Sequence, residues 1–242
     1  MREHDHAPPV LYEDESVIAV DKPAGIPVIP ARNEGDRCLR ALVEAARRES
    51  LWVVHRIDRD TSGVVVFART RKAHRALSMA FEARKIEKRY VAFVRSDVRA
   101  GEGDRRITTA LHEARKGKMR PALEGERDSL ASETVVTFAT PVKTTVGFVS
   151  RVDARPLTGR QHQIRVHLRS IHTPLLVDGL YGGATGRAEG ALGDGSPALD
   201  RLTLHAATLS FAHPTTHERL VIESPLASDL AELDRWLAAR QS

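Results

Sequence analysis

One polar block constrains the fold of this chain more than any other segment, because residues His55–Gly63 stand between two short apolar runs. The runs are Leu51–Val54 and Val64–Ala68. Together the three segments predict a strand, a polar loop and a second strand. A carboxylate in such a loop is held by a rigid scaffold, which suits a nucleophile or a general base. A plain turn is the alternative, because Asp, Thr, Ser and Gly are all turn formers.

Strand-like and helix-like segments alternate along the rest of the chain. Short apolar runs predict further strands at residues 17–20, 90–94, 133–139, 148–153 and 202–211. Apolar residues at helical spacing predict helices at residues 39–48, 71–84, 160–171 and 229–239. We expect irregular loops at residues 96–132 and 182–197, and a flexible tail at residues 1–9. This pattern predicts a single α+β domain over residues 10–242.

The composition limits the class of protein. The chain has 37 Lys and Arg against 32 Asp and Glu, a net charge of +5 that fits a polyanionic partner without requiring one. A single cysteine, Cys38, excludes an internal disulfide framework and a cysteine-based metal cluster. No apolar run approaches the ~18 residues that span a bilayer, and the N-terminal segment lacks the apolar core of a secretory signal. We therefore expect a protein of the reducing cytoplasm with no membrane segment.

A second polar segment, Thr158–Arg169, is rich in arginine and histidine. If it is helical, His162, Arg165 and Arg169 share one face. Cations near a helix start can hold phosphate together with free backbone N–H groups, and a solvated basic face is the alternative. An arginine facing Asp58 would lower the pKa of that carboxyl and keep it ionised. Spacing alone does not decide whether the two side chains meet.

Other chemistries fit the sequence less well. His162, His167 and His172 are spaced by five residues, whereas the zinc-binding helix motif needs a spacing of four, so we expect no metal site. Ser62 lacks the Gly-x-Ser-x-Gly context of a hydrolase nucleophile. Cys38 is expected to be a core residue. Neither a Walker motif nor a dinucleotide-binding glycine pattern is present in the sequence.

Four groups of segments match the motifs of a known family in the same order along the chain. They are Val10–Asp14 with Asp21–Gly25; His55–Gly63; Thr158–Leu168; and Asp178 with Tyr181–Gly182, Leu204–Ala206 and His213–Pro214. The second is similar to the signature His-Arg-Leu-Asp-x-x-Thr-Ser-Gly, with Ile57 in place of Leu. The third is similar to Gly-Arg-Thr-His-Gln-Ile-Arg, with Gln161 in place of Thr. On these motifs the chain resembles the RluA-type RNA pseudouridine synthases from about Val10 to Pro214.

The resemblance implies the pseudouridine synthase fold, a mixed and mostly antiparallel sheet with flanking helices and a central cleft. It implies that Asp58 is the catalytic aspartate, that Tyr90 is the active-site tyrosine and that Arg165 is the arginine paired with that aspartate. It implies neither a cofactor nor a metal. Many members carry an N-terminal S4 RNA-binding domain. Because only a short tail precedes Val10, we expect a compact member without that domain.

The implied activity is the isomerisation of specific uridines in rRNA or tRNA to pseudouridine, and the implied partner is structured RNA. Reaching a uridine in folded RNA requires unstacking it. Arg56 is the candidate for filling the vacated space or binding a neighbouring phosphate. Further RNA contacts are expected from His55, Arg160, His162, Gln163 and Arg169, with Arg115 and Lys118 along the phosphate backbone. A catalytically inactive RNA-binding protein of the same fold is the alternative. The chain lacks a coiled-coil heptad pattern, so we expect a monomer.

Overall fold

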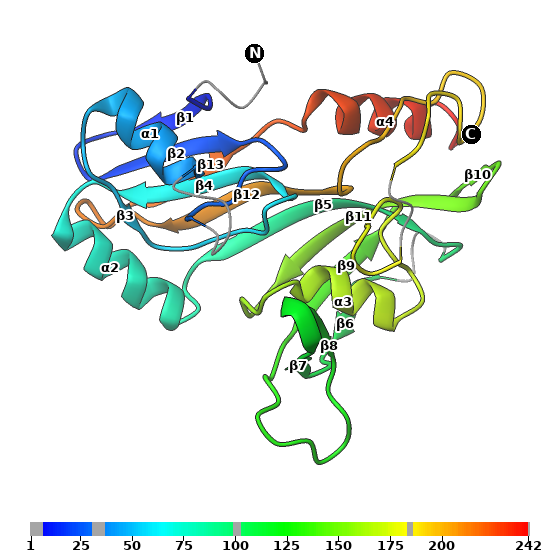
Figure 1. The fold of residues 1–242 in the computed structure, drawn as a ribbon, viewed down its shortest axis with the longest axis horizontal. Helices are drawn as coiled ribbons and strands as arrows, with labels where there is room; N and C mark the ends of the chain where they lie inside the picture. Colours follow the sequence, from blue (N-terminus) through cyan, green and yellow to red (C-terminus); the bar gives the residue numbers. More distant parts are fainter. Residues whose placement is uncertain (1–6, 31–36, 99–102, 183–185, 242) are drawn as a thin grey trace. The chain divides into compact units, whose positions relative to one another are not determined.

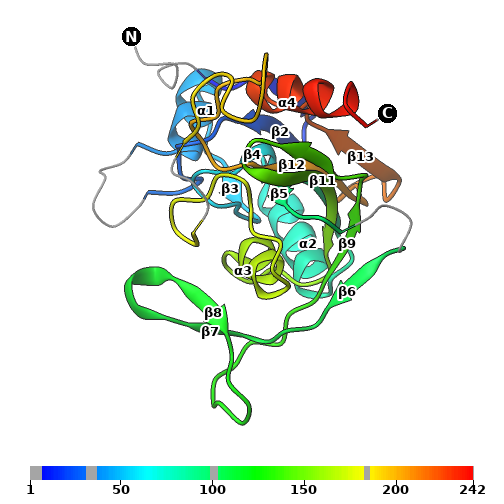
Figure 2. The same ribbon diagram turned by 90° about the vertical axis from the view of Figure 1, so that its right-hand side faces the viewer.

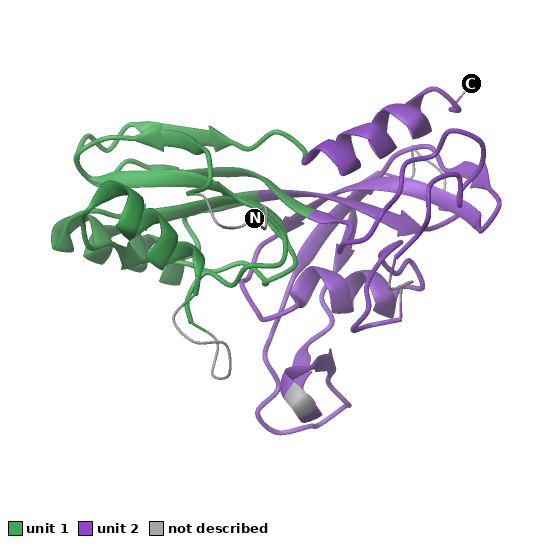
Figure 3. Ribbon diagram, turned by 45° about the horizontal axis from the view of Figure 1, so that its top comes forward, with its two compact units in different colours: residues 1–88, 205–226 green, residues 89–204, 227–242 purple. Residues whose placement is uncertain are grey.

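The computed structural model describes residues 7–30, 37–98, 103–182 and 186–241, with Lys116 described by its backbone alone. The chain forms two compact units, one of residues 1–88 with 205–226 and one of residues 89–204 with 227–242 (Figure 3). The predicted tail and single domain stay predictions, and of the tail only residues 7–9 lie within the described ranges. Among the described residues, no helix is long and apolar enough to cross a bilayer.

The first unit is built on a sheet with two helices. Its strands are β1 (Val10–Glu13), β2 (Val17–Lys22), β3 (Trp52–Val53), β4 (Ser62–Ala68), β12 (Leu204–Ala212, from His205 onward) and β13 (Arg219–Glu223), and its helices are α1 (Leu39–Arg47) and α2 (Arg71–Glu82). The order is β1-β2-β4-β12, with β13 paired to β12 and β3 paired to β4. β4 and β12 are parallel where Ser62 and Gly63 meet His205 and Ala206, and the other described pairs of this unit are antiparallel.

Strands β2 and β4 are the core of the first unit. β4 is buried along its whole length, and β2 is buried except for partial exposure at Asp21. On one face Val66 packs with Leu77 of α2, and on the other Phe67 packs with Leu39 of α1. Figure 1 shows the two helices on opposite sides of these strands. A strand covered on both faces gains from an apolar residue at every position, which explains the unbroken apolar run in β4.

The second unit is also built on a sheet, together with a separate hairpin. Its strands are β5 (Glu87–Arg95, from Arg89 onward), β6 (Arg105–Ile107), β7 (Leu111–Glu113), β8 (Met119–Pro121), β9 (Thr134–Phe138), β10 (Val142–Thr144) and β11 (Gly147–Pro156), and its helices are η1 (Arg115–Gly117), α3 (Gln163–Ser170) and α4 (Ser228–Ala238). The sheet order is β5-β11-β9-β6, with β10 paired to β11. β7 and β8 form the hairpin.

Helix α3 packs against the sheet of the second unit on one side and contacts β8 on the other. Its Ile164 and Leu168 belong to one core cluster with Val136 of β9 and Val152 of β11. Its Val166 belongs to a second cluster that also holds Leu111, Met119, Leu180 and Tyr181. Figure 2 shows the β7–β8 hairpin next to α3. The helix is therefore fixed between the sheet and the hairpin.

The predicted fold class is confirmed, because helices flank sheets whose described pairs are mostly antiparallel. The irregular loop expected at residues 96–132 is wrong in part, because this stretch holds β6, β7, η1 and β8. These strands have three residues each, and one residue of each is buried, so no alternating pattern marks them in the sequence. The sequence analysis also missed β10 and β13. The central cleft stays a prediction.

Candidate active site

The first unit carries Asp58 in the polar loop between β3 and β4. Asp58 is half-buried, and its backbone carbonyl accepts a hydrogen bond of 3.2 Å from the N–H of Thr61. The neighbouring Arg56 is exposed. The loop therefore has the turn expected from its composition, and its geometry at Asp58 depends on a backbone hydrogen bond.

A buried lysine anchors this loop. The Nζ of Lys22 donates to the carbonyl oxygens of Pro23 at 2.8 Å, Ile26 at 2.8 Å and Arg59 at 2.7 Å. The Gly25 N–H donates to the same Arg59 carbonyl, and Arg59 Nε donates to the Gly25 carbonyl, both at 3.0 Å. Three carbonyl acceptors compensate an ammonium group that is shielded from water. The Lys-Pro-Ala-Gly turn and the Asp58 loop are thus held together by the Lys22 ammonium and by the two hydrogen bonds between Gly25 and Arg59.

Replacing Lys22 with methionine is expected to lower the free energy of unfolding by about 3 kcal/mol, because it leaves three carbonyl groups without their charged donor. Urea denaturation measures this change. Lys143→Met is the matched control, because Lys143 is exposed on β10, and it should change stability by less than about 0.5 kcal/mol. An unchanged midpoint in Lys22→Met would contradict the anchoring role.

His55 lies against helix α2. Its ring stacks on Phe81 with centroids 4.9 Å apart and planes at 18°, and its Nε2 accepts a hydrogen bond of 3.0 Å from the Val66 N–H. Desolvation by burial, aided by the charge of Lys88, lowers the pKa of His55 from 6.5 to about 3. The imidazole is therefore neutral at pH 7. The predicted contact of His55 with RNA stays a prediction, while the structure gives the ring a packing role.

The low pKa of His55 predicts acid sensitivity. Between pH 6.5 and about 3 the folded chain binds fewer protons at this ring than the unfolded chain does. Its contribution to stability is therefore complete above pH 6.5 and is lost as the pH falls towards 3. We expect His55→Gln, which does not titrate, to have a flatter dependence of unfolding free energy on pH in this window. Urea denaturation across the window measures the slope, and a slope equal to that of the unsubstituted chain would refute this origin.

A buried chain of polar groups crosses the sheet of the first unit beside this loop. Ser62 Oγ lies 2.7 Å from Nδ1 of His205, and Nε2 of His205 lies 3.2 Å from Oγ of Ser224. Ser224 Oγ donates in turn to Asp21 at 2.8 Å. Ser62 is 2% exposed and His205 is 0% exposed, so a substrate carbonyl has no access to this hydroxyl. The arrangement argues against a serine hydrolase.

Gln163, at the start of α3 in the second unit, is a hub of hydrogen bonds. Its Oε1 accepts from Thr158 Oγ1 at 2.6 Å and from the Arg160 N–H at 3.0 Å. Its Nε2 donates to the Glu133 carbonyl at 2.8 Å and to Thr134 Oγ1 at 2.9 Å. This buried amide joins α3 to β9. Its predicted contact with RNA stays a prediction, and the geometry supports a structural role.

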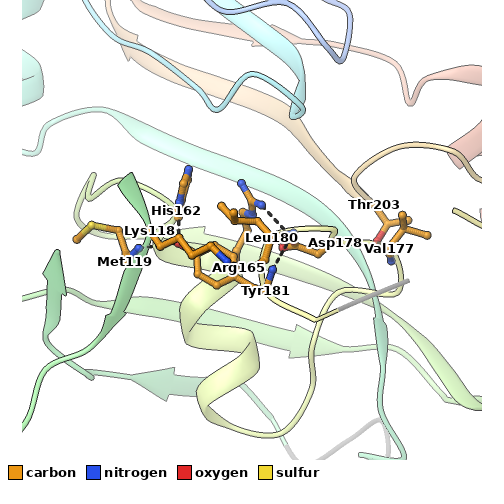
Figure 4. Close-up of polar contacts among 9 residues, drawn as sticks. All are labelled: Lys118, Met119, His162, Arg165, Val177, Asp178, Leu180, Tyr181 and Thr203. Carbon is orange, nitrogen blue, oxygen red and sulfur yellow. Dashed lines mark hydrogen bonds and ion pairs between the residues drawn. The ribbon is translucent and has the colours of Figure 1, made fainter. Parts of the chain in front are cut away.

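Arg165 of α3 forms a buried ion pair with Asp178. Nε and Nη2 of Arg165 donate to Oδ2 and Oδ1 of Asp178 at 2.9 and 2.8 Å, and both side chains are at most 5% exposed (Figure 4). Asp178 Oδ1 also accepts the N–H groups of Leu180 at 2.9 Å and Tyr181 at 3.1 Å. The bidentate pair fixes the plane of the guanidinium. Its pairing with Asp58, which the resemblance implies, stays a prediction.

The sequence analysis did not identify Asp178 as the partner of Arg165. The two residues are 13 positions apart, and a loop separates α3 from Asp178. The Asp178 carboxylate binds the N–H groups two and three residues further along the chain, as in an Asx turn. An aspartate in a loop can signal such a turn in the sequence. The identity of the cation facing that turn depends on the tertiary fold.

The remaining predicted residues are distributed over both units. Tyr90 is half-buried on β5 and packs against the core of the second unit. Arg160 Nε donates to the Ala131 carbonyl at 3.2 Å. His162 immediately precedes α3 and has a left-handed backbone conformation with φ 54°. Arg169 is exposed on α3. Asp58, His55 and Arg56 belong to the first unit. The assembly of Asp58, Tyr90 and Arg165 into one site stays a prediction.

In the described parts of the chain, no three His, Cys, Asp or Glu side chains lie close enough together to hold a metal ion. Two arrangements among these polar groups bear on the candidate site. One is a half-buried carboxylate on a loop anchored by Lys22, and the other is a buried arginine with a fixed plane.

Comparisons with known proteins agree with the motifs. Residues 16–170 match the family model for RNA pseudouridylate synthase. The chain is 36% identical over 210 residues to the dual-specificity RNA pseudouridine synthase RluA of Vibrio cholerae, a match covering 86% of this chain and 78% of that protein. It is also 36% identical over 232 residues to the ribosomal large subunit pseudouridine synthase D of Xanthomonas campestris, covering 93% and 67%.

A solved structure agrees in fold. Human RNA Pseudouridylate Synthase Domain Containing 1 is similar with a TM-score of 0.73 at 22% identity, covering 100% of this chain and 97% of the human one. At that identity the likeness concerns the fold alone. The family match and the relatives of higher identity confirm the resemblance seen in the motifs, and the chain therefore belongs to the RluA-type RNA pseudouridine synthases and is an enzyme of that family.

Proposed function

We propose that this enzyme converts specific uridines of rRNA or tRNA to pseudouridine with Asp58 as its catalytic carboxylate. The observation that carries the proposal is the anchored loop, in which Lys22 holds the backbone at Arg59 while the Asp58 side chain stays half-exposed. A carboxylate carried by an anchored backbone keeps its place during a reaction. The names of the two bacterial relatives support an RNA substrate, and one of them names the ribosomal large subunit.

The proposed reaction is an isomerisation. The bond between N1 of uracil and C1′ of the sugar breaks, the base rotates, and a bond forms between C5 and C1′. The proton on C5 leaves and N1 gains one, so atoms and electrons balance without an external oxidant or reductant. Asp58 acts at the sugar or at the base. Tyr90 offers a ring that can stack on uracil and a hydroxyl that can move a proton.

Arg165 is proposed as the cation beside the reacting carboxylate. Its fixed guanidinium plane supports this role, because a preorganised charge needs no rearrangement during the reaction. The proposed contacts with RNA are made first by arginines, namely Arg56, Arg160, Arg169 and Arg115. Further candidates for RNA contact are His55, His162, Gln163 and Lys118. We propose a monomer that acts in the cytoplasm, where ribosomal RNA is found.

Mapping of pseudouridine in RNA tests this proposal. The purified chain is incubated with rRNA and tRNA transcripts that contain no modified bases, without added metal or cofactor, and the products are mapped by position. Pseudouridine at defined positions is the expected result. RNA binding without product would instead favour the inactive RNA-binding alternative, and product that requires a metal would overturn the proposed chemistry.

A further inference from the structure

The hairpin of β7 and β8 is held against the segments that carry and orient Arg165. Three contacts made by consecutive residues hold it there. Gln161 Nε2 donates to the Gly117 carbonyl at 3.2 Å, Lys118 Nζ donates to the Leu180 carbonyl at 3.2 Å, and the Met119 N–H donates to Tyr181 Oη at 2.7 Å. We call residues 111–121 the arm. Two of these three hydrogen bonds are with the turn that Asp178 organises.

Tyr181 occupies the point where the arm, α3 and this turn meet (Figure 4). Its hydroxyl oxygen accepts the Met119 N–H at 2.7 Å, and the same oxygen lies 2.7 Å from Nδ1 of His162. Its backbone N–H is held by Asp178 at 3.1 Å. The side chain is 5% exposed. Tyr181 is thus fixed at both its backbone and its hydroxyl.

The ring of Tyr181 supports Arg165. The guanidinium carbon of Arg165 lies 5.0 Å from the ring centroid, within the range of a cation–π contact. Asp178 binds the edge of the same guanidinium through two hydrogen bonds. The carboxylate fixes the plane of the group, and the aromatic face limits its movement out of that plane. Tyr181 therefore contacts the arginine with one part of its side chain and the arm with another.

We propose that Tyr181 is a positioning residue that couples docking of the arm to the orientation of Arg165. The hydroxyl carries the link to the arm through the Met119 N–H, and the ring carries the link to Arg165. The arm also bears cations, among them the exposed Arg115. Binding of RNA phosphates to the arm then favours its docked position and, through Tyr181, the orientation of the arginine. This inference rests on the proposed function, because it assumes that Arg165 acts in the reaction.

Two variants of one residue separate the two links. Tyr181→Phe removes the hydroxyl and keeps the ring, so we expect the KM for RNA to rise about fivefold while kcat stays within about twofold. Tyr181→Leu removes both, so kcat should also fall, by about tenfold or more. Tyr12→Phe is the control, because it removes a tyrosine hydroxyl that bonds Asp14 in the first unit, and it should leave both constants unchanged.

Two measurements that do not depend on turnover complete the test. Amide exchange of Met119 should accelerate in Tyr181→Phe while the Leu180 amide, bound by Asp178, keeps its protection. The NMR signal of the Arg165 Nε–H should shift on RNA binding in the unsubstituted enzyme, lose that response in Tyr181→Phe, and be displaced without RNA in Tyr181→Leu. A Leu variant with the kcat of the unsubstituted enzyme, or an unchanged Met119 amide in the Phe variant, would overturn the coupling. An unsubstituted enzyme without turnover would overturn the proposed function instead.

Discussion

Replacing Asp58 with asparagine is expected to lower kcat by about a thousandfold or more while RNA affinity stays within about threefold. Asparagine has nearly the same shape but carries no charge and is a poor nucleophile and base. The turn around Asp58 uses its backbone carbonyl, which accepts the Thr61 N–H, so the substitution leaves that hydrogen bond in place. Release of tritium from RNA labelled at C5 of uridine measures turnover, and filter binding measures affinity.

Asp60→Asn is the matched control for this prediction. Asp60 is an exposed carboxylate two residues further along the same loop, so its substitution makes the same change of charge nearby. We expect its kcat to stay within about twofold of the unsubstituted enzyme. Turnover in Asp58→Asn equal to that in Asp60→Asn would remove Asp58 from the mechanism. If Asp58→Asn loses RNA binding and Asp60→Asn keeps it, the Asp58 carboxylate acts in RNA recognition.

Gly63→Ala is expected to destabilise the fold by several kcal/mol, a large share of the ~5–15 kcal/mol that keeps a domain folded. Gly63 adopts φ +114°, which L side chains rarely adopt, and a Cβ built there would lie 2.1 Å from the Ala206 carbonyl oxygen. That oxygen belongs to the backbone of β12, which pairs with β4 at this position. Relief of the clash therefore requires the two strands to separate at the end where the Asp58 loop enters β4.

Gly147→Ala is the control that separates the cost of a strained backbone from the cost of the steric clash at Gly63. Gly147 adopts a similar φ of +99°, but a Cβ there would meet nothing within 4 Å. Gly147→Ala should lower the free energy of unfolding by only ~1–2 kcal/mol, the cost of the strained backbone. Urea denaturation of both variants gives the difference, which measures the contribution of close packing between β4 and β12. Equal losses would show that the approach of Ala206 does not matter.

Local patterns predicted the long elements well. The apolar run at 64–68 lies within β4, and the helix expected at 71–84 is α2 at Arg71–Glu82. These elements bury residues at a regular period, and that period is a property of the local sequence. The same method missed three short strands of the second unit. These strands are β6, β7 and β8. They are stabilised by pairing with other strands and by contacts with distant residues, such as the hydrogen bond of Met119 to Tyr181.

The candidate site shows the same division. The motifs singled out Asp58, Arg165 and the family, because those residues stand in long signatures that do not require knowledge of the fold. The roles of their neighbours could not be read in the same way. Lys22 was part of a turn motif, and only the structure shows its ammonium bound to three carbonyls. The expected contact of Gln163 with RNA stays a prediction, and only the structure shows that its amide joins α3 to β9.

The sequence by itself determined the family, the class of fold and the residues of the signatures, because spacing and residue type along the chain are sufficient for these. The tertiary structure alone decided which groups satisfy the buried charges. The Arg165–Asp178 pair and the Lys22 anchor bring together residues from separate segments. A buried charge needs a partner within a few ångströms, and the identity of that partner depends on how the chain folds in three dimensions.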